Sequence, residues 1–142
     1  TPMPERDGAT EWINGEAPRR DELIGNPTLV CFWAVSCHLC HENMPAVAAW
    51  REQYGPQGLN VIFIHMPRQP QDTDVEKVRK AVAELGIGGA VGIDNQHALT
   101  DAFQNSYVPA YFLFDREGNL RSRAAGDAGL AMMEAALRRQ FA

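Results

Sequence analysis

Cys37 and Cys40 are the residues whose type and spacing point most directly to chemistry in this chain of 142 residues. An apolar run from Thr28 to Val35 precedes them, with the length and the Val, Phe and Trp content of a buried strand. Helical character follows, to about residue 51. The first sulfur then lies beside the unpaired N–H groups of a helix N-terminus, which favour the thiolate, and the second lies one turn along. This arrangement predicts thiol–disulfide exchange, with Cys37 as the solvent-facing nucleophile and Cys40 as the buried resolving thiol.

Three other interpretations use the same residues. With His41 the pair spells C-x-x-C-H, the attachment pattern of c-type haem, although a buried strand ahead of the motif argues against that use. A copper- or zinc-binding module is the second, but the chain has neither a second C-x-x-C nor a spaced pair of histidines. The third is a structural disulfide without redox work, which the position at a helix start disfavours. A metal would have to draw its further ligands from His38, His41, His65 and Cys31.

The rest of the chain must fold into elements that position this junction. Hydrophobic patterns predict a short edge strand at 11–14 and strands at 28–35, 59–66, 90–94, 110–115 and 120–125. Helices are predicted after the cysteines and at 73–85, 97–104 and 128–140, with a single turn within 19–25. Thr73 to Glu76 has the pattern of a capping box, Gly86 ends that helix, and Pro45 should bend the helix that contains it.

These elements predict the fold class. Strands that alternate with helices pair in parallel, and the hairpin near the C-terminus adds antiparallel strands. We therefore expect an α/β three-layer sandwich with a mixed central sheet and helices on both faces. Residues 10–142 are expected to form a single domain, and the Pro- and charge-rich residues 1–9 a loose tail.

Composition excludes several classes of partner. The formal net charge is −5 and no basic cluster occurs, so nucleic acid and anionic membrane surfaces are poor candidates. Three cysteines cannot all pair, which excludes a disulfide framework. No run approaches the roughly 18 apolar residues of a membrane span, and no signal peptide opens the chain. Thr1 is not a natural start, so we expect that a signal or anchor preceded it.

Two segments carry a family resemblance. Phe32-Trp33-Ala34-x-x-Cys37-x-x-Cys40, with a proline five residues later, resembles the active-site segment of thioredoxin-fold oxidoreductases. Residues 107–118 resemble the cis-proline strand and hairpin of that superfamily, and the helix-bearing insertion 71–92 is similar to that of the TlpA/ResA-like branch. The resemblance implies an extracytoplasmic enzyme that exchanges disulfides with protein partners. No bound cofactor is needed, because the electrons reside in the cysteine pair, and we expect a monomer that receives electrons from an upstream thiol donor. A cytoplasmic location is the alternative.

The same resemblance assigns roles near the cysteines. It implies a cis peptide before Pro109, with the backbone of Val108 holding an extended substrate and Trp33 packing under the disulfide. Two positions depart from the family, because Cys31 replaces a buried aspartate and Asn43 replaces a glutamate. The proton acceptor for the resolving thiol Cys40 is therefore unassigned, with bulk water or His41 as candidates.

Two further expectations concern reactivity. We expect His38 to tune the reduction potential modestly, and the potential to lie below about −200 mV, in the reducing half of the range from about −270 to about −120 mV. A peroxiredoxin-like thiol peroxidase is a further alternative, but Trp33 to Ser36 supply neither the Pro nor the Thr that such enzymes place ahead of the cysteine. His65, at a predicted strand end, is expected to serve the surface or a turn.

Overall fold

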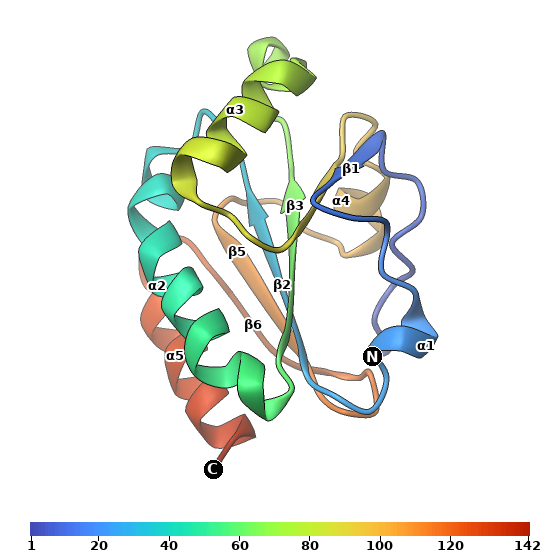
Figure 1. The fold of residues 1–142 in the computed structure, drawn as a ribbon, viewed down its shortest axis with the longest axis vertical. Helices are drawn as coiled ribbons and strands as arrows, with labels where there is room; N and C mark the ends of the chain where they lie inside the picture. Colours follow the sequence, from blue (N-terminus) through green and yellow to red (C-terminus); the bar gives the residue numbers. More distant parts are fainter.

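The computed structural model describes residues 1–142, in which six strands form one mixed sheet (Figure 1). The strand order is β1-β4-β3-β2-β5-β6. Strand β2 is central, parallel to β3 and antiparallel to β5. The strands are β1 (Glu11–Ile13), β2 (Thr28–Trp33), β3 (Asn60–His65), β4 (Ala90–Ile93), β5 (Ala110–Phe114) and β6 (Leu120–Ala125).

Helices cover both faces of the sheet, which gives the three-layer α/β sandwich that the sequence predicts (Figure 1). Helices α2, α3 and α5 pack on one face, and α1 and α4 with the N-terminal segment pack on the other. The helices are α1 (Arg20–Leu23), α2 (His38–Tyr54), α3 (Val75–Leu85), α4 (Ala98–Ala102) and α5 (Gly129–Gln140), with short 3₁₀ helices η1 (Gly55–Gln57) and η2 (Pro70–Thr73).

Every residue of strand β2 is buried, and all but Thr28 are apolar, as expected for a strand that is covered on both faces. Side chains alternate along a strand, so Cys31 and Trp33 lie with the cluster under α2, whereas Val30 and Phe32 lie with the cluster under α4. The strand ends at Trp33 and the chain turns through four residues into α2. This connection places the C-x-x-C at the edge of the sheet where β2 and β3 end.

One detail of the helices differs from the sequence predictions. The N-cap of α3 is Asp74 and not Thr73: its carboxylate accepts from the N–H groups of Glu76 and Lys77 at 3.0 and 3.4 Å. Thr73 belongs to η2, and its hydroxyl donates to the carbonyl of Pro70. Pro45 lies within α2, as predicted, and the helix continues to Tyr54.

The N-terminal nine residues were expected to be loose, and here the structure differs. Met3 and Arg6 are 2% and 1% exposed, and the N–H of Met3 donates to the carbonyl of Gly118 in the β5–β6 turn. The Arg6 guanidinium donates to the carbonyls of Pro4 and Pro18. A charged, Pro-rich composition indicates a tail only where its side chains find no partners, and in this fold backbone carbonyls satisfy the arginine.

Candidate active site

Cys37 is the N-cap residue of α2, as the sequence predicts for the first cysteine of the motif. Its Sγ accepts a hydrogen bond from the N–H of Cys40 at 3.0 Å. The two cysteines form a disulfide, with their Cα atoms 5.3 Å apart. An N–H that points at this sulfur, together with the positive end of the helix dipole, stabilises negative charge on Cys37 more than on Cys40, which lies inside the first turn.

The disulfide is more covered than the sequence suggests. Cys37 was expected to face solvent, but in the oxidised protein Cys37 and Cys40 are only 3% and 2% exposed. Both belong to the hydrophobic cluster between the sheet and α2, against which Val35, Leu39 and Val108 also pack. The apolar side chains around the motif account for the difference, because a helix N-terminus predicts open solvent only where no neighbour covers it.

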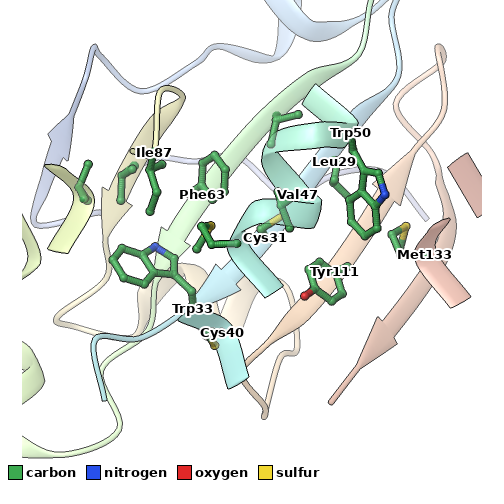
Figure 2. Close-up of a cluster of buried hydrophobic side chains, with 14 of the residues drawn as sticks. Leu29, Cys31, Trp33, Cys40, Val47, Trp50, Phe63, Ile87, Tyr111 and Met133 are labelled. Atoms are coloured by element: carbon green, nitrogen blue, oxygen red, sulfur yellow. The ribbon is translucent and has the colours of Figure 1, made fainter. Parts of the chain in front are cut away.

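Trp33 belongs to the same buried cluster as Cys37 and Cys40 (Figure 2). It is 1% exposed, and its ring meets that of His65 edge to face with 5.0 Å between centroids. Strands β2 and β3 pair in parallel with Trp33 opposite His65, and this register brings the two rings together.

The expectation for His65 was wrong, because this side chain is fully buried. Its Nε2 accepts a hydrogen bond from the N–H of Val35 at 3.0 Å, so the imidazole holds the loop that leads to Cys37. Burial lowers the pKa of His65 to about 4, although the nearby Asp72 carboxylate acts in the opposite direction. The ring is therefore neutral at neutral pH. The sequence could have indicated this position, because His65 ends a predicted strand and the carboxyl ends of adjacent parallel strands meet at one edge of the sheet.

Cys31 lies under α2 beside a polar pair that the sequence does not reveal (Figure 2). It pairs across the sheet with Tyr111, whose hydroxyl oxygen accepts a hydrogen bond from the Asn43 amide at 3.1 Å. Burial raises the pKa of Tyr111 to about 12, with Cys31 adding to the rise and the Asn43 bond opposing it. The two positions that depart from the family pattern thus meet around one phenol.

Cys31 is expected to be unreactive in the folded protein. It is the free cysteine, it is 3% exposed, and burial raises the pKa of its thiol well above the usual range. Thiol counting of the oxidised protein should find no fast-reacting cysteine and one that is unmasked by denaturant. A Cys31→Ala variant should keep its exchange activity, and loss of activity without loss of folding would contradict this expectation.

The Val108–Pro109 peptide bond is cis, as the resemblance implies. Ala110 pairs with Phe32, so the two residues before it lie alongside the end of β2 and the start of the motif loop. Val108 is half-buried, and neither its N–H nor its C=O is hydrogen-bonded within the protein. The neighbouring Tyr107 is 67% exposed, while its carbonyl is held by the Asn105 amide at 2.8 Å.

The histidines of the motif have different surroundings. His38 projects into solvent and pairs with Glu42 at 2.9 Å, one turn along α2. Positive charge on His38 would therefore act mainly on that carboxylate, which leaves less of it for Cys37. His41 is half-buried, and its Nε2 has no protein partner. No group of three or more His, Cys, Asp or Glu side chains is arranged to hold a metal ion.

Comparison with known proteins supports thiol–disulfide chemistry at this cysteine pair. The family described as Redoxin matches residues 15–137. Thiol-disulfide oxidoreductase YkuV from Bacillus subtilis is 49% identical over 142 residues, which span 99% of this chain and 95% of that protein. The chain belongs to the Redoxin family. A solved thioredoxin-like protein in the oxidised form is 48% identical, with a TM-score of 0.87 over 97% of this chain and 93% of the other.

A longer relative shares the same unit. Protein DipZ from Mycobacterium tuberculosis is 33% identical over 95% of this chain, which corresponds to only 20% of that protein. The Redoxin match, these relatives and the C-x-x-C at disulfide distance show that the chain is a thiol–disulfide oxidoreductase of the thioredoxin fold. The predicted TlpA/ResA-like membership and fold class are confirmed.

Proposed function

We propose that Cys37 is the attacking thiolate and Cys40 the resolving thiol in the reduction of disulfides in partner proteins. The hydrogen bond from the Cys40 N–H to the Cys37 sulfur carries this assignment, because only the first cysteine occupies the cap of α2. A thiolate at that position keeps the same donor and gains the favourable field of the helix. Cys40, one turn further in, has no comparable donor from a helix start.

The exchange needs no cofactor, because the two cysteines supply both electrons. The Cys37 thiolate attacks one sulfur of the partner disulfide, a mixed disulfide forms, and the other partner sulfur leaves as a thiolate that takes up a proton. Cys40, after losing its proton, attacks the Cys37 sulfur and releases the second partner thiol. Two electrons pass from the dithiol to the partner, and the Cys37–Cys40 disulfide is formed. A dithiol donor must then reduce it for the next cycle.

The unpaired backbone of Val108 supports a site for the partner's main chain. An extended segment that adds alongside residue 108 would receive a hydrogen bond from its N–H and donate one to its C=O. Because Val108 and Leu39 also pack against the cluster that contains the disulfide, such a segment would bring its cystine onto the cysteine pair. Trp33 is covered, so its contribution to substrate binding would be support from beneath and not direct contact.

The direction of electron flow is expected to be towards the partner. His38 pairs with Glu42, so it does little to stabilise a thiolate on Cys37 and therefore little to raise the reduction potential. We therefore expect a reduction potential below about −200 mV, closer to thioredoxin than to a strong oxidant near about −120 mV. Equilibration with glutathione at neutral pH, read by thiol alkylation, measures this potential. A value close to that of the strong oxidant would make the protein a donor of disulfides.

The compartment and the assembly are also part of the proposal. No helix of the chain has the length and apolar character that crossing a membrane requires. The TlpA/ResA-like resemblance supports a location outside the cytoplasm, and we expect the protein to work there as a monomer with an upstream thiol donor. A fusion of the natural gene to a reporter that is active only after export, together with sedimentation of the purified protein, would test location and assembly.

A further inference from the structure

A polar cluster lies directly before the nucleophile and has no part in the exchange scheme above. Its centre is Asp72 in η2, which is 3% exposed. The Asp72 Oδ2 atom accepts hydrogen bonds from the hydroxyl of Ser36 at 2.7 Å and from the N–H of Arg68 at 2.9 Å. Burial alone would raise the pKa of Asp72, but these bonds and the nearby His65 lower it overall, so the carboxylate is ionised.

The cluster also fixes the position of a cation. The Arg68 guanidinium donates to the same Ser36 hydroxyl through Nε at 3.2 Å and Nη2 at 3.1 Å. The acceptor is an uncharged hydroxyl oxygen, and the Arg68 guanidinium forms no ion pair with a carboxylate within 4.0 Å. Ser36 is therefore bonded from two sides by the segment that follows β3, and it is the residue that directly precedes Cys37.

We propose that Arg68 is a positioning residue for the exchange reaction, which stabilises the Cys37 thiolate from a place that Ser36 and Asp72 fix. The inference rests on the proposed role of Cys37 as nucleophile. The first turn of helix α2 has no acidic residue, and its two histidines are His38, whose partner is Glu42, and the half-buried His41. The guanidinium on Ser36 is thus a permanent positive charge, without an ion-pair partner within 4.0 Å, that the fold brings to this end of the helix.

The other charges near the loop do not replace it. His65, which holds the Val35 N–H, is neutral because its pKa is about 4. Asp72 acts against the thiolate, but the hydrogen bonds that its carboxylate accepts from Ser36 and from the Arg68 N–H offset part of its negative charge. Arg68 is exposed, so water and salt weaken its effect without removing it.

The test is the pKa of Cys37 in the reduced protein, measured by its alkylation rate against pH. Arg68→Met, which keeps an unbranched flexible stem and removes the guanidinium with its charge, is expected to lower the thiolate fraction at pH 7 by about two- to five-fold. Arg68→Lys should restore most of that fraction. Added salt should move the wild-type pKa towards that of Arg68→Met and should change the variant less.

Arg138→Met is the matched control for net charge. Arg138 is exposed near the end of α5, which lies at the opposite end of the molecule from the start of α2 (Figure 1). An equal pKa change in this control, an unchanged pKa in Arg68→Met, or failure of Arg68→Lys to restore it would overturn the inference. A wild-type Cys37 with an ordinary pKa beside a more reactive Cys40 would instead refute the assignment of the nucleophile.

Discussion

Cys40→Ser should turn the protein into a trap for its partners, because the step that releases the mixed disulfide is lost. The attacking sulfur of Cys37 remains at the cap of α2, so the first exchange still occurs. The resolving step is intramolecular and therefore fast in the wild type, so its removal should raise the amount of mixed disulfide by about ten-fold or more. Non-reducing electrophoresis of the variant after incubation with an oxidised protein mixture measures this amount.

Cys37→Ser is the matched control for the trap. This substitution removes the sulfur that the helix N-terminus stabilises. The remaining thiol belongs to Cys40, which is 2% exposed in the oxidised protein and therefore poorly accessible to a partner. We expect little covalent complex from this variant and no reductase activity. Equal trapping by both variants would show that the two sulfurs are equivalent towards partners, and trapping by Cys37→Ser alone would reverse their roles.

The stability of the fold should fall steeply between pH 7 and pH 4 because of His65. The imidazole is neutral in the folded protein, with its pKa lowered from 6.5 to about 4, whereas it is free to take up a proton in the unfolded chain. The unfolded state thus binds more protons in this window. The contribution of the neutral ring is complete above pH 6.5 and is lost as the pH falls through about 4. The loss amounts to about 3 kcal/mol of unfolding free energy, measurable by urea titrations at both pH values.

His65→Gln separates this effect from the titration of carboxylates. A glutamine side-chain oxygen can accept from the Val35 N–H as Nε2 does, but it does not titrate. Asp72 also loses a stabilising charge as the pH falls, since its pKa is lowered in the folded protein, and that loss remains in the variant. The difference in pH dependence between wild type and His65→Gln therefore reports the imidazole. The same slope in both proteins would assign the acid sensitivity to carboxylates.

The reacting groups and most of the fold could be predicted from the amino-acid sequence. An apolar run followed by C-x-x-C and a helix predicts where Cys37 and Cys40 lie relative to a strand and a helix dipole, because these relations are local along the chain. The periods of the other segments predict the strands and helices to within a few residues, and their alternation predicts the mixed sheet. The resemblance adds the cis peptide before Pro109, which no local pattern would indicate.

Tertiary structure alone decided which distant polar groups meet the cysteine loop. His65 reaches the Val35 N–H, and Asp72 reaches Ser36, only because β3 pairs in parallel with β2 and the chain then returns through η2 past the same sheet edge. The Asn43–Tyr111 bond likewise requires α2 to lie over β5. Hydrophobic periodicity records which face of an element is buried, but it carries no information on which polar side chain the opposite element supplies. For that reason the sequence places His65 only at a strand end and Asp72 only in an inserted segment. In the fold, these two residues hold the loop that carries the nucleophile.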